Sequence, residues 1–128
     1  STISRLREQP LAAAPARRIL DADTRRAAKS FLGRLKGRHD PLDALVYGSR
    51  ARGDHRPDSD ADIAVILEGR PGNRYEILHE LSDVAYDVLL ETGIHIQPLP
   101  IWEVEMRRPE LFNNPALIET IQREGLRP

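Results

Sequence analysis

The sequence predicts a small α/β (α+β) protein of one domain, in which a mixed β-sheet carries helices packed on one side. Three observations predict this class. Short β-prone runs end at turn residues, one long segment has apolar residues at helical spacing, and helical and strand segments alternate along the chain. With 128 residues, the chain is long enough for a single hydrophobic core.

The first segment, residues 1–22, mixes Pro, Ala and Arg without clean periodicity, so we interpret it as a lead-in with room for one short helix. The domain itself is expected over residues 23–128. Its first helix is predicted within residues 21–39, because apolar residues recur there at helical spacing. Asp23 or Thr24 is the expected N-cap of this helix.

Three strands and a long helix are predicted in the middle of the chain. Residues 42–47 (LDALVY) and 61–67 (ADIAVIL) are short, β-prone and bounded by turn residues. Residues 74–92 carry a stripe of apolar side chains every three or four positions, and Gly93 is the expected C-cap of that helix. Residues 94–99 (IHIQPL) are predicted as the third strand.

The tail, residues 100–128, is predicted to form two short helices. The second is well delimited: Asn114 is a typical N-cap, Pro115 suits the first helical position, and Gly125 lies beyond the end. No internal repeat is present in the sequence.

The composition excludes several functional classes. There is no cysteine, so disulfides, zinc thiolate sites and thiol nucleophiles are ruled out. No stretch resembles a signal peptide or reaches the ~18 apolar residues of a membrane span, so a cytoplasmic protein without membrane contact is expected. The net charge of −1 gives no strong signal for nucleic-acid binding.

The segment between the first two strands, GSRARGDHRPDSDAD at residues 48–62, carries the chemistry. Its Gly-x4-Gly spacing resembles a P-loop, but Asp54 and His55 stand where a P-loop needs Lys and Ser or Thr. Its aspartates resemble the start of an EF-hand loop, but Ile63 stands where that loop needs glycine. Both readings are therefore rejected.

Asp60 and Asp62 are separated by one residue at the start of a predicted strand, so both side chains leave the same face of the sheet. Two hard carboxylates on one face suit one or two Mg²⁺ ions, which take their remaining ligands from phosphates and water. We therefore predict that Asp60 and Asp62 are metal ligands and catalytic residues.

Gly48 and Ser49 lie between a predicted strand and a helical turn. Backbone N–H groups and the Ser49 hydroxyl can receive a triphosphate there, and Gly48 lets the backbone approach closely. Arg50 and Arg52 add positive charge for the same anion. These four residues are the predicted nucleotide-binding residues.

Gly-Ser, ten residues and Asp-x-Asp, written here as GSRARGDHRPDSDAD, resembles the signature of the DNA polymerase β-like nucleotidyltransferase superfamily. In its short length, the chain resembles the members of the minimal nucleotidyltransferase branch of this superfamily. The resemblance covers about residues 42–98. It implies the polymerase β-like nucleotidyltransferase fold. It also implies transfer of a nucleoside monophosphate from Mg-NTP to a hydroxyl, with Gly48 and Ser49 on the β/γ-phosphates and Asp60 and Asp62 on the metals.

The minimal branch further implies a partner. Its members commonly act as antitoxins of a small helical toxin of the HEPN type, and attach AMP from ATP to a tyrosine hydroxyl of that toxin. The resemblance therefore implies Mg²⁺ as cofactor, ATP as substrate, and a HEPN-type toxin as the protein partner.

The chain departs from the family at one position. Members usually carry a third carboxylate on the strand after the long helix, but here His95 and Gln97 occupy the matching strand face. His95 is a candidate general base or weak metal ligand, and Gln97 offers an amide oxygen. An alternative is therefore a catalytically degenerate protein that binds nucleotide or partner and inhibits by occupancy. Transfer to a small molecule such as an aminoglycoside is disfavoured, because no substrate domain is evident.

Overall fold

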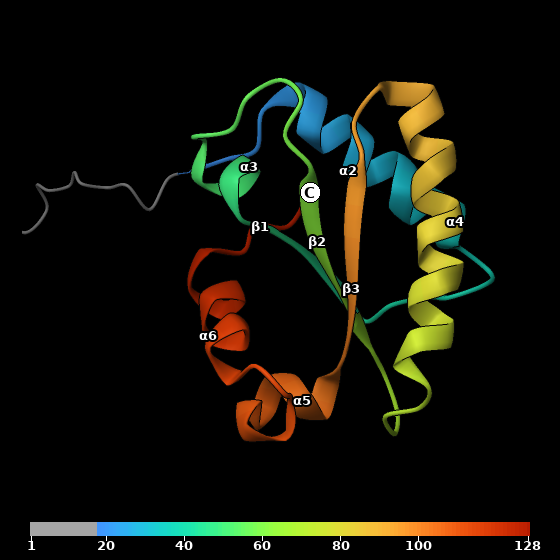
Figure 1. Ribbon diagram of the computed structural model, residues 1–128, viewed down its shortest axis with the longest axis vertical. Coiled ribbons are helices and arrows are strands. Elements are labelled where there is room, and N and C mark those ends of the chain that lie inside the picture. The colour runs from blue at the N-terminus through green and yellow to red at the C-terminus, as the bar shows by residue number, and fades with distance from the viewer. Residues whose placement is uncertain (1–17) are drawn as a thin grey trace, which may run out of the picture.

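The computed structural model describes residues 18–128, which form a three-stranded sheet in the order β1-β2-β3 with helices around it (Figure 1). β1 (Asp43–Tyr47) runs antiparallel to the central strand β2 (Ala61–Leu67), and β3 (Ile96–Trp102) runs parallel to β2. The α/β class with a mixed sheet is confirmed. The predicted lead-in helix falls outside the described residues.

The helical elements agree with the predicted order. They are α2 (Ala22–Leu35), α3 (Ser49–Arg52), α4 (Arg74–Thr92), α5 (Glu103–Arg107), the 3-10 turn η2 (Pro109–Leu111) and α6 (Pro115–Glu124). The predicted bounds of α4 are confirmed, with Asn73 capping its start and Gly93 in the left-handed conformation at its end. Asn114 caps α6 as predicted, by accepting from the Leu117 N–H.

The start of α2 differs from the prediction. Asp21, rather than Asp23 or Thr24, is the N-cap: its carboxylate accepts the Thr24 N–H at 3.2 Å and the Thr24 hydroxyl at 2.6 Å. Asp21 has the extended backbone that an N-cap needs, whereas Asp23 is already the second residue of the helix, within its first turn, and pairs with Arg26. The helix therefore begins earlier than expected.

Helices cover both faces of the sheet, not one side as predicted. α2 and α4 cover one face over the larger core, while α6 and the segments before it cover part of the other face (Figure 1). The second core consists of alternate residues of β2 and β3 with apolar residues of the tail, namely Ala64, Ile66, Ile101, Phe112, Ile118 and Ile121. This arrangement could not be predicted from the sequence, because the tail helices are too short for their apolar pattern to indicate which face of the sheet they cover.

β3 also differs at its start. It begins at Ile96 rather than Ile94 and continues to Trp102 through two prolines. β3 is an edge strand of the described sheet, and an edge is where prolines are tolerated, since one row of its backbone N–H groups has no strand to pair with.

The C-terminal residues close along β1. Leu126 and Val46 exchange backbone hydrogen bonds of 2.8 Å in both directions, and the Arg127 guanidinium pairs with the Asp43 carboxylate at 2.6 Å. Gly125 lies so close to β1 that a Cβ on it would meet the Leu45 Cβ at 3.1 Å. The end of α6 is therefore held against the strand that leads into Gly48.

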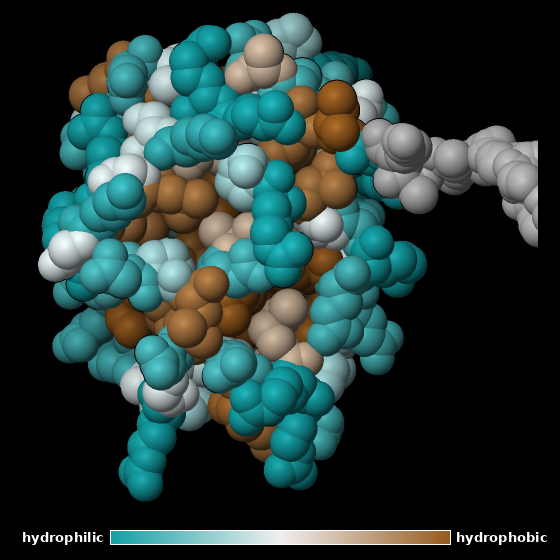
Figure 2. Space-filling model, turned by 180° about the vertical axis from the view of Figure 1, so that it is seen from behind, coloured by the Kyte–Doolittle hydropathy of each residue, from teal (hydrophilic) through white to brown (hydrophobic). Residues whose placement is uncertain are grey.

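The surface seen from behind is mostly hydrophilic, with apolar patches towards its middle (Figure 2). Large apolar side chains exposed over the described residues include Tyr75, Tyr86 and Leu90 on α4. Within residues 18–128, no helix combines the length and the apolar character that crossing a membrane requires.

Candidate nucleotide and metal site

Gly48 connects β1 to α3 and brings the two halves of the predicted motif into contact. Its backbone has φ +79° and ψ −155°, a region that is open almost only to glycine. A Cβ on Gly48 would lie 2.4 Å from the Asp62 Oδ2 atom. The Gly-Ser turn and the Asp-x-Asp strand, separated by a loop in sequence, are thus side by side in space.

Asp62 is the only residue of β2 that is not buried, and it is half-exposed beside this turn. Burial raises the pKa of its carboxyl, and the neighbouring charges of Asp60 and then Glu124 raise the pKa further, while Arg52 opposes them. The raised pKa thus reflects burial first and the negative charge of neighbouring carboxylates second, and a bound cation would compensate that charge.

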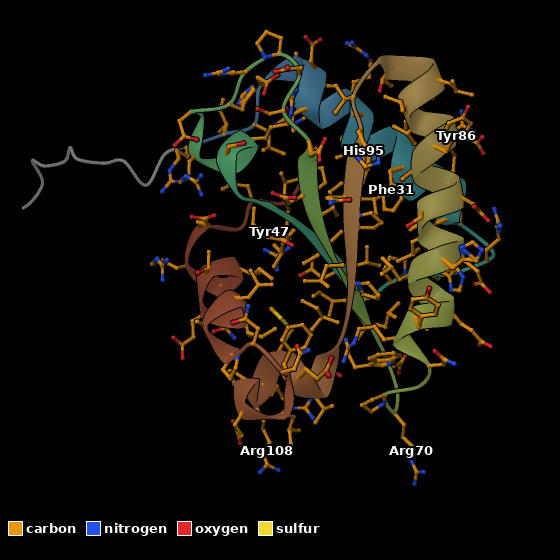
Figure 3. All side chains as sticks on the ribbon, viewed as in Figure 1. Phe31, Tyr47, Arg70, Tyr86, His95 and Arg108 are labelled. Carbon is orange, nitrogen blue, oxygen red and sulfur yellow. The ribbon has the colours of Figure 1, made fainter. Side chains whose placement is uncertain are left out.

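Two polar residues, His95 just before β3 and Gln97 within it, lie next to the two aspartates. Gln97 is the register partner of Asp62, and the His95 Nδ1 atom lies 3.4 Å from the Asp60 Oδ1 atom. Figure 3 shows His95 at the N-terminal end of β3. The structure therefore brings His95 to the predicted site, and it places no carboxylate at the positions expected for a third acid.

Tyr47 is a residue of this site that the sequence did not indicate. It is the register partner of Asp62 on the other neighbouring strand, and it lies on the sheet face towards α6 (Figure 3). Burial, and then the charge of Asp62, raises the pKa of its phenol to about 12. Tyr47 thus remains a neutral hydrogen-bonding group across the physiological range.

The two predicted arginines have different surroundings. Arg50 is 3% exposed, and its guanidinium donates to the carbonyls of Ser59 and Pro57, both at 3.0 Å, and to the Thr24 hydroxyl at 2.8 Å. This differs from the predicted phosphate contact: Arg50 holds the loop that leads to Asp60. Arg50 does not point to a phosphate, because its guanidinium N–H groups already donate to the loop carbonyls and to Thr24.

Arg52 stays at the surface beside the turn. Its guanidinium donates to the Asp54 carboxylate at 3.2 Å and to the Glu124 carboxylate at 3.3 Å, and its side chain is 45% exposed. Ser49 is half-exposed as the first residue of α3. Both residues therefore remain where a phosphate at Gly48 could reach them.

Glu124 is a second residue that sequence reasoning missed. Its Oε2 atom accepts the Gly48 N–H at 2.7 Å, although 76 positions separate the two residues, and its side chain is 9% exposed. Glu124 ends α6, whose periodicity indicates only which face is buried. No short-range pattern could have placed it at the Gly-Ser turn.

The residues present fit a divalent cation that takes few protein ligands. Asp60 and Asp62 supply carboxylate oxygens, which are the donors that Mg²⁺ prefers. The described residues contain no group of three or more His, Cys, Asp and Glu side chains arranged to hold a metal by themselves. Such a cation would need further oxygen ligands from a phosphate or from water, and the Gly48 turn lies where a phosphate could supply them.

Comparisons with known proteins identify the family and support the fold. The model of the family described as "Nucleotidyltransferase domain" matches residues 28–124. Matching solved structures include a protein from Sulfolobus solfataricus that is provisionally assigned as a nucleotidyltransferase. The match has a TM-score of 0.52 and 23% sequence identity, covers 66% of this chain and 72% of that one, and thus supports a common fold. No curated protein matches the chain at a significant level.

Proposed function

Because the chain belongs to the nucleotidyltransferase domain family, we propose that it transfers a nucleoside monophosphate from a metal-bound nucleoside triphosphate to a hydroxyl group. In this reaction the hydroxyl oxygen attacks the α-phosphorus, the bond to the β-phosphate breaks, and pyrophosphate leaves. The observation that carries the proposal is the contact between the Gly48 turn and Asp62, since it joins a phosphate-binding backbone to a cation-binding carboxylate.

Each side chain has a role that follows from its position. Asp60 and Asp62 hold the metal, which would be Mg²⁺. The metal supplies charge neutralisation for the transferred phosphoryl group. The Gly48 N–H, Ser49 and Arg52 bind the β- and γ-phosphates and orient the nucleotide.

His95 is the candidate for receiving the proton of the attacking hydroxyl. Its Nδ1 atom faces Asp60 at 3.4 Å, so Nε2 is the ring nitrogen left to accept that proton. The carboxylate of Asp60 orients the ring in this arrangement and stabilises the imidazolium that forms.

The finer proposal is that ATP is the substrate and that AMP is attached to a tyrosine of a small helical toxin of the HEPN type. What supports it is the resemblance of the Gly-Ser and Asp-x-Asp spacing to the minimal nucleotidyltransferase branch. The direct test is transfer of labelled AMP from ATP to such a partner in the presence of Mg²⁺.

Nucleotide binding can be tested without a partner. ATP should raise the melting temperature strongly with Mg²⁺ and much less with EDTA, because the metal joins the carboxylates to the phosphates. The paired change Asp60→Asn with Asp62→Asn should abolish the Mg²⁺-dependent shift, whereas Asp58→Asn, in the preceding loop, should leave it intact. A wild-type response in the paired variant would show that the site is elsewhere.

A second candidate function is inhibition of a partner by occupancy, with little or no transfer. The observation that favours it is the absence of an acid at position 95, just before β3, and at position 97 within β3, where Gln97 pairs with Asp62. Gln97→Asp and His95→Asp should each raise a slow transfer rate if the natural protein is degenerate. If His95→Ala instead abolishes a robust transfer, His95 is the working base and the occupancy function is wrong.

A further inference from the structure

A carboxylate of the chain itself occupies the place assigned to the nucleotide phosphates. Glu124 accepts the Gly48 N–H at 2.7 Å and the Arg52 guanidinium at 3.3 Å. Both donors belong to the group that is proposed to bind the β- and γ-phosphates. A carboxylate and a phosphate oxygen compete for such donors, because each N–H can make only one good hydrogen bond at a time.

The location of Glu124 is otherwise unfavourable for an acid. It is the last residue of α6, where the helix dipole disfavours negative charge, and its side chain is 9% exposed. The favourable contacts that offset these costs are the Gly48 N–H and Arg52, so these two groups act as an anion receptor that Glu124 fills.

The backbone around Glu124 is fixed in this position. Leu126 and Val46 hydrogen-bond to each other in both directions at 2.8 Å, and Gly125 packs directly against Leu45. The backbone next to Glu124 is therefore held against β1, and this places the Glu124 carboxylate at the Gly48 turn. A rotation of the Glu124 side chain, without movement of the helix, is the simplest way to vacate the receptor.

We propose that Glu124 is a built-in competitor for phosphate, which occupies the Gly48 N–H and Arg52 in the empty site and is displaced when a polyphosphate binds. This inference rests on the proposed function. Glu124 thereby sets the affinity of the site for the triphosphate part of the nucleotide. It also keeps the Gly48 N–H paired when no ligand is present.

Direct binding measurements on the full chain test the proposal. Mg-ATP and Mg-tripolyphosphate would be titrated calorimetrically into wild type, Glu124→Gln, Glu124→Ala and the control Glu119→Gln. Glu119 is an exposed acid of the same helix, so the control removes an equal charge away from the turn. Glu124→Ala should bind both ligands about tenfold more tightly, because the carboxylate that competes for the Gly48 N–H and the Arg52 guanidinium is removed. Glu124→Gln should show a smaller gain, and Glu119→Gln should match wild type.

Opposite results would overturn the inference. Unchanged or weaker binding in Glu124→Gln means that Glu124 does not compete with phosphate, and weaker binding with a greater Mg²⁺ requirement identifies it as a metal ligand. Glu124→Gln preserves the side-chain shape, so it decides the matter even if Glu124→Ala fails to fold. Failure of the proposed function gives a different pattern: Asp60→Asn with Asp62→Asn would then keep wild-type affinity for Mg-ATP.

Discussion

At the scale of single residues, the site depends on what lies over the missing Cβ of Gly48. Gly53, at the other end of α3, also has a positive φ, of +86°, but a Cβ on Gly53 would meet no atom within 4 Å. Both glycines relieve backbone strain, and only Gly48 also makes room for a carboxylate. Substitution of Gly53 would therefore introduce backbone strain alone, whereas substitution of Gly48 would introduce backbone strain and also block the site.

We predict that Gly48→Ala abolishes the Mg²⁺-dependent stabilisation by ATP, whereas Gly53→Ala retains it. Both variants should lose about 1–3 kcal/mol of unfolding free energy from backbone strain. Gly48→Ala must also displace the Asp62 carboxylate, which lies 2.4 Å from the new Cβ. Melting temperatures with and without Mg-ATP would measure both effects, and equal ligand responses of the two variants would contradict the role given to Gly48.

Where the pattern is local, the sequence predicted which residues lie together. Alternation along the strands predicted that His95 and Gln97 lie beside Asp60 and Asp62, and the structure places them so, while the roles of the four residues stay predictions. Arg50 was misassigned, because sequence alone does not tell whether an arginine points to a ligand or into loop carbonyls.

At the scale of elements, the ends of helices are fixed by their caps, and the caps were predicted unevenly. Gly93 and Asn114 were identified correctly, since each stands alone next to a clear helical stripe. At α2, the sequence DADT offers several capping residues in a row, and propensity alone could not choose among them. The structure selects Asp21 through its two bonds to Thr24.

Removal of this cap should be measurable. Asp21→Ala should lower the unfolding free energy by about 1 kcal/mol, because the Thr24 N–H and hydroxyl lose their acceptor. Asp23→Ala, which removes only an exposed pair with Arg26, should change stability by about 0.5 kcal/mol or less. Denaturant unfolding would compare the two variants, and a larger loss in Asp23→Ala would show that the cap is misassigned.

The clamp between β1 and the C-terminal segment should depend on pH. Hydrogen bonding from Arg127 lowers the pKa of Asp43 from its ordinary value of 3.8, with burial opposing and the Ala44 N–H assisting. The ionised carboxylate therefore stabilises the folded state above that value, and this contribution is lost as the pH falls through the lowered pKa. Asp43→Asn should have a lower melting temperature than wild type at pH 7, and the difference should narrow from about pH 5 downwards. If the difference in melting temperature does not change with pH, the ionised Asp43 carboxylate is not the source of the stabilisation.

At the scale of the whole molecule, β2 lies between two cores on opposite faces of the sheet. Phe31 of α2 is fully buried in one core and Ile118 of α6 in the other. Alternating residues of the same strand belong to both cores, so the two faces cannot unfold independently without breaking β2. The sequence predicted the strands, but the second core could not be foreseen, since it depends on how three short tail segments fold back.

Ile118→Ala therefore tests whether the tail belongs to one cooperative unit. We expect a loss of about 2–5 kcal/mol, as for a buried aliphatic side chain, and Leu111→Ala, which is 51% exposed, should cost far less. Trp102, the sole tryptophan, is buried in the other core and reports on it by fluorescence. Fluorescence and far-UV circular dichroism should shift together in Ile118→Ala, and a Trp102 transition that stays at the wild-type midpoint would contradict the single unit.

The buried guanidinium of Arg50 limits how far the motif can be transplanted. The residues between Gly48 and Asp62 look like a portable loop, but their path is tied through Arg50 to a hydroxyl on α2, outside the loop itself. If the fifteen residues 48–62 were grafted onto another sheet, the predicted metal ligands Asp60 and Asp62 would be transferred without the hydrogen bond from Arg50 to Thr24 that fixes the path of the loop. A successful graft would need a threonine equivalent to Thr24 on a neighbouring helix, so the minimal transferable unit of this site is a loop together with a helix.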